Sequence, residues 1–486
     1  MNVAFRKDLV SVLLLLAGAS LIAITNDSFW IDECLSAQLS QTATIGDCWS
    51  KARTVPEIQL PFYLLYTWTY GHLFGTGEWV LRFAGFPWFV TGATIFSIYV
   101  GRVVKSSLLP ALVIACSAFA WYYLNEARVY TLQLGCVFIM LGAGCELLRT
   151  LKTGAPDPRA WRLLLLGYFL LSGMSVLAAM WGFFFMLTFL LVLGFANGMR
   201  LLRLSPWCTA LCLIGLTGLA IYYGWTMTLH AKPTAVGTTT PQTMVFVFYE
   251  LLGFVGWGPG RNDLRANGVA ALKPFIVPLA AYALLNVAIL WNGIQELRSR
   301  AGKRRFLAAS MLVLVPFVLI CAVGVATHFR VLGRHASPLF AILIVVTVFG
   351  IFRAIRSGRK FGWPLASLFL VMAFVSCLLI RFAPRHKKDD YRSAAAIAKS
   401  AAATGMLVWW AADGGGATNY GAGRQGIKVT INKTINELRA MSPPDLVILS
   451  KPDTYDGNGG VTEYILAAGY RVATNVPAFV IWAKGP

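Results

Sequence analysis

The segment Trp30-Ile31-Asp32-Glu33-Cys34 decides how the rest of this chain is interpreted. It lies a few positions after the first long apolar run, residues 9–25. In a chain with 57% hydrophobic and only 13% charged residues, two adjacent carboxylates just beyond a membrane span are costly unless they are hydrated or functional. Taken alone, they fit solvated loop residues. The later segments of the chain decide between these two interpretations.

The apolar runs predict a polytopic α-helical membrane protein. Runs of roughly 16–22 residues recur along the 486 residues, and each is long enough to cross a bilayer as a helix. We expect about eleven transmembrane helices by the hydropathy criterion. They lie near residues 9–25, 80–100, 107–124, 128–148, 162–178, 180–197, 207–229, 273–292, 306–326, 337–353 and 363–380. The first run resembles a signal peptide, but Trp30-Ile31-Asp32 would be a poor cleavage site, so we expect a retained helix.

The basic residues indicate the orientation of these spans. The net charge is +21, and the basic residues fall in clusters on alternate loops, which favours a topology signal over nucleic-acid binding. The clusters lie near residues 6–7, 102–105, 149–162, 200–203, 298–305 and 353–360. Under the positive-inside rule these segments and the N-terminus are cytoplasmic. The Asp32 loop, the turn at 125–128, the loop 230–272, the turn at 328–335 and everything after Arg381 then lie outside.

The composition divides the chain into two domains. Residues 1–383 carry the spans and an external loop at about 26–79, in which residues 34–42 and 61–74 read as surface helices. Residues 384–486 lack long apolar runs and predict a small extracytoplasmic α/β domain. We expect helices at 391–402, 431–441 and 461–468, and strands at 406–411, 446–449, 470–474 and 478–483. Gly414-Gly415-Gly416 reads as a surface loop, because no phosphate-binding pattern surrounds it.

The nine cysteines show no metal-ligand spacing. Cys34 and Cys48 share the first external loop, where a disulfide or two free thiols are both compatible with the sequence. We assign no metal site and no certain cofactor, and leave a divalent metal open.

Charged residues near the outer ends of the spans are few. Arginine among them suits an anionic head group, because its guanidinium forms paired hydrogen bonds to phosphate oxygens. The competing interpretation is that each one reaches lipid head groups or pairs with a nearby acid. The set comprises Asp32, Glu33, Glu57, Glu78, Arg82, Glu126, Arg128, Lys232, Arg261, Asp263, Arg265, His328, Arg330, Arg334 and His335.

An ordered series of motifs resembles the protein O-mannosyltransferase and aminoarabinose lipid A transferase superfamily. The series covers roughly residues 1–380. It comprises Trp30-Ile31-Asp32-Glu33, Leu60-Pro61-Phe62-Tyr63-Leu64-Leu65, Leu73-Phe74-Gly75-Thr76-Gly77-Glu78-Trp79-Val80-Leu81-Arg82-Phe83, Asn125-Glu126-Ala127-Arg128-Val129-Tyr130-Thr131-Leu132 and Gly333-Arg334-His335-Ala336-Ser337-Pro338-Leu339. The resemblance implies a GT-C fold, a glycosyltransferase of the bacterial inner membrane, a periplasmic active site and a polyprenyl-phosphate sugar donor. Its acceptor would be a lipid, a glycan or a protein.

The sequence also departs from that family. Gln59-Leu60 stands where members often carry a histidine before the proline, and His335 replaces a common tyrosine. The clustered histidines that bind metal in some relatives have no evident equivalent among the five here.

By resemblance, Asp32 is the general base and Glu33 orients the acceptor or supports Asp32. Arg128 and Arg334 are the choices for the donor phosphate, and Arg82, Arg330 and Lys232 are further candidates. For the acceptor, the sugar or support, the candidates are Glu57, Glu126, Tyr130 and His335.

Base and leaving group on opposite faces of the sugar would give inversion, whereas retention would need a second carboxylate, for which Glu57 stays open. Two other classes are a lipid-linked sugar transporter or flippase and a non-catalytic assembly subunit. The almost wholly apolar mid-span positions disfavour transport.

Overall fold

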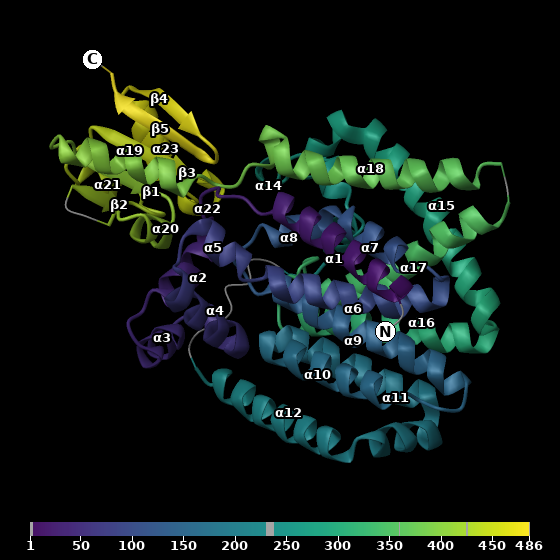
Figure 1. The fold of residues 1–486 in the computed structure, drawn as a ribbon. Coiled ribbons are helices and arrows are strands. Elements are labelled where there is room, and N and C mark those ends of the chain that lie inside the picture. Colours follow the sequence, from purple (N-terminus) through teal and green to yellow (C-terminus); the bar gives the residue numbers. More distant parts are fainter. Residues whose placement is uncertain (1–2, 230–237, 359, 424–425, 486) are drawn as a thin grey trace.

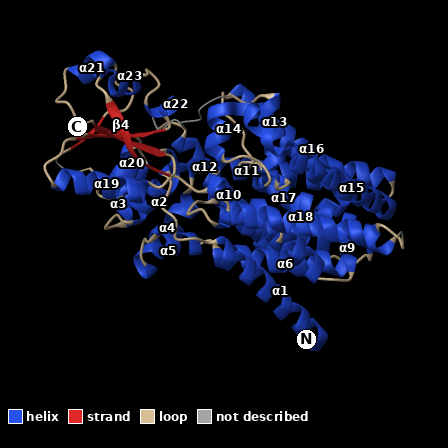
Figure 2. Cartoon of the chain, turned by 90° about the horizontal axis from the view of Figure 1, so that it is seen from above, coloured by secondary structure: helices blue, strands red, loops and turns tan. Residues whose placement is uncertain are grey.

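We analysed a computed structural model of the chain, which describes residues 3–229, 238–358, 360–423 and 426–485. A bundle of long helices fills most of the molecule, and a small domain with a β-sheet lies at one end of it (Figures 1 and 2). The sequence-based prediction of a polytopic helical protein with a small C-terminal α/β domain is confirmed.

The bundle consists of apolar helices. Its members are α1 (Val3–Ala23), α5 (Glu78–Phe83), α6 (Phe86–Val104), α7 (Leu108–Ala115), α8 (Ala118–Leu124), α9 (Tyr130–Lys152), α10 (Pro158–Met174), α11 (Val176–Leu204), α12 (Pro206–Thr226), α15 (Ile276–Ala301), α16 (Lys303–Ala326), α17 (Ser337–Arg356) and α18 (Gly362–Phe382). Within the described residues, eight segments are long and apolar enough to cross a membrane. The chain is therefore a multi-pass membrane protein, while the total of eleven spans stays a prediction.

One expected span has a different form from the prediction. Residues 107–124 form two short helices, α7 and α8, instead of one continuous helix. The break lies at Ser117, which has an extended backbone and whose hydroxyl accepts a hydrogen bond from Ala120 N at the start of α8. A hydrophobicity pattern does not detect this break, because the flanking residues are apolar on both sides.

Helix α9 is the centre of the bundle and packs closely on α6 and α10. Gly92 of α6 lies directly against Gly135 of α9, and a Cβ atom on either residue would overlap backbone atoms of the facing helix. Small residues allow this close approach of two helix backbones, the main source of helix–helix attraction inside a membrane. The close packing fixes the position of Tyr130 and of the loop before it.

Residues 31–74 and the loop before α15 form further short helices at the end of the bundle next to the C-terminal domain. They are α2 (Ile31–Ser40), α3 (Ile45–Ala52), η1 (Pro56–Gln59), α4 (Pro61–Phe74), α13 (Pro241–Leu251), η2 (Phe254–Gly256), α14 (Arg261–Asn267) and η3 (Gly268–Phe275). The expected surface helix at 61–74 is α4. The helix expected at 34–42 begins earlier, at Ile31, so Asp32 and Glu33 lie in its first turn. Carboxylates are favourable there, next to the unpaired N–H groups of a helix.

A mixed five-stranded sheet organises the C-terminal domain. The strands are β1 (Val408–Ala411), β2 (Ile427–Val429), β3 (Leu446–Ser450), β4 (Tyr470–Val476) and β5 (Phe479–Lys484), in the order β2-β1-β3-β5-β4. Strand β1 is parallel to β2 and β3, whereas β5 is antiparallel to β3 and β4.

Helices cover both faces of this sheet (Figure 1). The helices of the domain are α19 (Tyr391–Ala403), α20 (Gly414–Asn419), α21 (Ile435–Arg439), α22 (Pro452–Tyr455) and α23 (Gly460–Ala467), and η4 (Pro384–His386) leads into it. Four elements differ from the expectation: β2 and α22 are additional, α21 is shorter than the helix expected at 431–441, and Gly414-Gly415-Gly416 opens α20. The side chain of Asp413 accepts a hydrogen bond from Gly416 N and caps this helix.

Cysteine labelling tests the predicted orientation. On a background that lacks the nine native cysteines, we expect a cysteine at Ala43 or Asn458 to react with an impermeant maleimide added from outside. A cysteine at Lys303 or Arg356 should not react until the membrane is permeabilised. All four positions are exposed in the structure, so side-chain burial will not mask a reaction. Labelling of Lys303 from outside would reverse the topology.

Candidate active site

The carboxylate of Glu33 links several segments at the end of the bundle next to the C-terminal domain. It is completely buried and accepts two hydrogen bonds from Arg82, at 2.9 Å from Nε and 2.8 Å from Nη2. It also accepts hydrogen bonds from Lys388 Nζ at 3.2 Å, from the Ala127 backbone N–H at 2.7 Å and from the Trp30 backbone N–H at 3.2 Å. A single side chain thus joins α2, α5, the loop 125–129 and the linker to the C-terminal domain.

The environment of Glu33 stabilises its charged form. Burial alone would raise its pKa, but the charges of Arg82 and Lys388 and the hydrogen bonds from Arg82 and Ala127 lower the pKa from 4.5 to about 2. For Lys388 the effect of burial is the stronger one: it lowers the pKa to about 8, although the Glu33 carboxylate favours the charged form. Glu33 is therefore ionised at neutral pH and has no free oxygen for a substrate.

Asp32, the preceding residue, is in a different environment. About one third of its side chain is exposed, and its Oδ2 lies 3.5 Å from Arg334 Nη1. The backbone oxygen of Asp32 accepts a hydrogen bond from Arg128 Nη1 at 3.0 Å. Asp32, Arg128 and Arg334, which lie far apart in the sequence, are brought together as expected.

Arg128 is buried and pairs with Glu57 of η1, with 2.9 Å between Nη1 and Oε1. The same nitrogen also donates to Ser36 Oγ at 3.2 Å. Burial lowers the pKa of Arg128, but Asp32 and Glu57 raise it well above its ordinary value, so the guanidinium stays charged. Its Nε and Glu57 Oε2 are buried without a hydrogen-bond partner among the described residues. Arg128 therefore fixes the first turn of α2 and keeps one N–H unused.

Arg334 lies across the face of the Tyr130 ring, 5.6 Å from the ring centre, and its Nε is 3.3 Å from Nε2 of His335. Burial and the neighbouring Arg334 charge lower the pKa of His335 well below its ordinary value, so this imidazole is neutral at pH 7. Tyr130 and His335 are thus placed beside Arg334, where they orient its guanidinium.

Glu126 is buried, and neither of its carboxylate oxygens has a hydrogen-bond partner among the described residues. Burial raises its pKa, and the charges of Lys388, Arg261 and Arg334 only partly offset that effect. Glu126 lies within the cluster but does not contact Asp32 through any hydrogen bond of the described residues.

The three further arginine and lysine candidates differ in their environments. Arg82 is fully buried and donates to Glu33 and to the backbone oxygens of Thr25, Asp27 and Ser28. These contacts leave Arg82 no open side toward a ligand. Arg330 is exposed and forms no ion pair in the part of the chain that the structure describes. Lys232 lies outside the described residues.

The structure adds three residues that the sequence-based site did not include. Lys388 reaches the site from the linker, Glu250 of α13 accepts a hydrogen bond from the Gly333 N–H at 2.8 Å, and Arg261 of α14 pairs with Glu250 at 3.0 Å. Glu250 thereby fixes the turn that carries Arg334. Arg261 was recognised as an outer-face charge, but its position beside the site depends on folding of the long loop 230–272.

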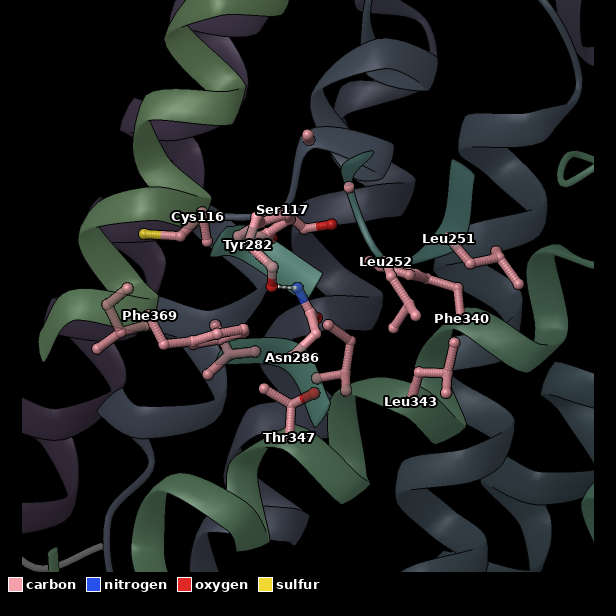
Figure 3. Close-up of a pocket in the computed structure, with 16 residues that line it drawn as sticks. Cys116, Ser117, Leu251, Leu252, Tyr282, Asn286, Phe340, Leu343, Thr347 and Phe369 are labelled. Carbon is pink, nitrogen blue, oxygen red and sulfur yellow. Dashed lines mark hydrogen bonds between the residues drawn. The ribbon is translucent and has the colours of Figure 1, made fainter. Parts of the chain in front are cut away.

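Two small pockets lie next to one another among the helices near these residues. The smaller pocket is lined by Tyr122, Tyr123, Glu250 and Arg261 together with apolar neighbours. It shares Ala118 with a larger pocket between α7, α13, α15, α17 and α18 (Figure 3). The larger pocket is apolar except for a few polar groups such as Ser117, Asn286 and Thr347.

Two expectations concern cysteine and metal. Cys34 and Cys48 are both buried free thiols in separate hydrophobic clusters, one on α2 and one on α3. Within the described ranges, no group of three or more histidine, cysteine, aspartate or glutamate side chains is close enough to hold a metal ion.

Comparisons with solved structures identify the fold. The chain is similar over its full length to ArnT from Cupriavidus metallidurans in the apo state, with a TM-score of 0.54, 14% identity and coverage of 99% of both chains. It is also similar to the same ArnT bound to undecaprenyl phosphate, with a TM-score of 0.51, 13% identity and coverage of 100% of both chains. No protein-family model matches the chain, and no curated protein matches it. The GT-C fold expected from the ordered motifs is confirmed; at this identity the likeness concerns the fold alone.

Replacement of Glu33 tests its anchoring role. We expect Glu33→Gln to lower the free energy of unfolding by about 3–5 kcal/mol, because it leaves Arg82 and Lys388 buried without their counter-charge. Thermal unfolding in detergent measures the change, and Glu463→Gln, at an exposed carboxylate, is the control.

The pH dependence gives a second measurement. Because the pKa of Glu33 is lowered on folding, its stabilisation is complete above pH 4.5 and is lost as the pH falls toward 2. Glu33→Gln should lack this part of the acid destabilisation. An unchanged melting temperature in Glu33→Gln would contradict the anchor.

Proposed function

We propose that the protein is a membrane glycosyltransferase that moves a sugar from a polyprenyl-phosphate donor to an acceptor on the outer face of the inner membrane. The observation that carries the proposal is the placement of the partly exposed Asp32 carboxylate beside Arg334 and Arg128, in a chain with the fold of ArnT. That one ArnT structure holds undecaprenyl phosphate supports a lipid phosphate as part of the donor.

Asp32 has the properties of a general base. Its side chain is partly hydrated, and its backbone is held by Arg128 and by the anchored neighbour Glu33. In the proposed reaction Asp32 accepts the proton of the acceptor group as that group attacks the anomeric carbon. The bond from the anomeric carbon to the phosphate oxygen breaks, and polyprenyl phosphate leaves with the electron pair.

The cationic residues would stabilise the leaving phosphate. Arg334 is held by Tyr130 and His335 on one side, and its contact with Asp32 is long enough at 3.5 Å for the guanidinium to turn toward a ligand. Arg261 pairs with Glu250 and lies over the Tyr122 ring, and Glu250 also holds the turn that carries Arg334, so a second guanidinium lies near this turn. Arg128, already paired with Glu57, is assigned mainly to holding Asp32, with its free N–H facing the same cluster.

One displacement with inversion is the proposed course. Glu33 cannot serve as a nucleophile, because its two oxygens are occupied by Arg82, Lys388 and backbone donors. Glu57 is buried and paired with Arg128, which disfavours the second carboxylate that retention requires.

Asp32→Asn tests the base. We expect turnover with a purified lipid-linked sugar to fall by about 10²–10⁴-fold, while the protein inserts and binds the donor normally, because a general base contributes about that much. Asp47→Asn, on the exposed start of α3 in the same external segment, is the control and should keep full activity. Near-native turnover of Asp32→Asn would exclude Asp32 as the base.

The donor phosphate contact is tested at Arg334. Arg334→Ala should weaken donor binding by about 1.5–3 kcal/mol, the contribution of a charge-assisted contact. Arg334→Lys should restore only part, since a point charge does not reproduce paired hydrogen bonds. The double variant with Arg128→Ala should deviate from additivity, because both arginines share Asp32. Arg330→Ala is the matched control on the same turn. If Arg330→Ala weakened donor binding as much as Arg334→Ala, the phosphate contact could not be assigned to Arg334.

A further inference from the structure

The linker between the bundle and the C-terminal domain, residues 383–390, and the first turn of α19 contact several segments around Glu33. Arg385 donates to the backbone oxygens of Gly256 and Gly258. Lys388 donates to Glu33 and to the backbone oxygen of Asn125, and Arg392 donates to Glu78 and to the backbone oxygen of Asn26. Only a few residues separate these contacts, so the linker cannot move without displacing the first turn of α2.

The C-terminal domain also grips α2 directly. Gln38 on α2 donates to the backbone oxygen of Gly415 at 2.7 Å. The Tyr420 hydroxyl accepts a hydrogen bond from the Phe29 N–H at 2.7 Å and donates to Glu78 at 3.0 Å. Beside Lys388, Asp389 pairs with Lys451 of the C-terminal domain. The domain therefore holds both ends of the linker and the helix that carries Asp32.

Lys388 differs from its neighbour Lys387 in one respect. Its ammonium group is buried and inserted between Glu33 and the loop 125–129, whereas Lys387 is exposed and forms no ion pair within the described ranges. Burial of a lysine ammonium group costs free energy unless the charge is paired and hydrogen-bonded. Arg82 already neutralises Glu33, so charge balance alone does not require a second cation there.

We propose that Lys388 is a positioning residue: through Glu33 and the Asn125 carbonyl it holds the Asp32 turn of α2 against the Arg128 loop, and so couples the C-terminal domain to the geometry of transfer. This inference rests on the proposed function. Lys388 contacts neither Asp32 nor the arginines proposed to bind phosphate, and it acts on them through the backbone of α2 and of the loop 125–129.

The proposed coupling predicts a specific dependence of kcat on pH. The groups that face the Lys388 ammonium are Glu33 on α2, Arg82 on α5 and Glu126 on the loop 125–129, together with the Asn125 carbonyl. Arg82 stays charged, and Glu33 stays ionised, far above neutral pH. With its pKa lowered to about 8 by burial, Lys388 is the member of this set that loses its charge between pH 7 and 9. The Asp32 turn should then loosen on the alkaline side.

The experiment compares Lys388→Met, Lys388→Arg and the control Lys387→Met in the full-length protein in nanodiscs. With a purified polyprenyl-phosphate sugar, wild type and Lys387→Met should lose kcat above about pH 8. Lys388→Met should have a kcat up to about 10²-fold lower than wild type at all pH values, with little change in KM for the donor. A small misplacement of a reacting group causes a loss of this size. Lys388→Arg should recover much of the activity and lack the alkaline fall. A Lys388→Arg profile that falls as in wild type, or a fully active Lys388→Met, would overturn the proposal.

Hydrogen–deuterium exchange separates this inference from the proposed function. Lys388→Met should increase exchange in residues 30–36 and 125–129, and Lys387→Met should not. If exchange is faster in Lys388→Met but the wild-type protein transfers no sugar from any polyprenyl-phosphate donor, the transferase function is refuted and the positioning role stands. Unchanged exchange in Lys388→Met would refute the positioning role whatever the protein's activity.

Discussion

The buried carboxylate of Glu33 is the constraint on which the candidate site of this protein depends. Five donors from four segments converge on its two oxygens. A buried charge is tolerated only when it is fully paired, so each of these segments has one acceptable position relative to α2. Asp32 directly precedes Glu33 in the first turn of α2, so its backbone is held in place by the same contacts. Glu33 and Asp32 are thus sequence neighbours in opposite environments: Glu33 is buried with both oxygens hydrogen-bonded, and Asp32, the proposed base, is partly exposed.

The arginines around the candidate site fall into two groups according to their hydrogen-bond and ion-pair partners. Arg82 and Arg128 are held by buried carboxylates and backbone oxygens, and they fix the fold around Asp32. Arg334 and Arg261 have weaker or more peripheral ion pairs, and Glu250 links them, because its carboxylate pairs with Arg261 and accepts a hydrogen bond from the Gly333 N–H beside Arg334. Residue type alone does not separate the two groups, because both consist of arginines just outside a span.

The sequence was informative where the pattern is local. The apolar runs gave the helices, and alternating segments after residue 384 gave most of the C-terminal sheet and its helices. The ordered motifs identified Asp32, Arg128 and Arg334 as neighbours. Lys388, Glu250 and Arg261 could not be assigned in this way, since each reaches the site through a contact between segments far apart in the chain. The break at Ser117 and the strand β2 were missed, because short elements carry too few residues to form a periodic pattern.

The linker contact also sets the order in which this centre can be completed during biosynthesis. Glu33 and Arg82 are 49 positions apart, so they can pair once the first spans are inserted, whereas Lys388 follows Glu33 by 355 positions. Every span between them must be inserted into the membrane before the ammonium group can enter. In a polypeptide released early, Glu33 would pair with Arg82 alone, and the link from Lys388 to the loop 125–129 would form only once the last fifth of the chain has emerged and docked.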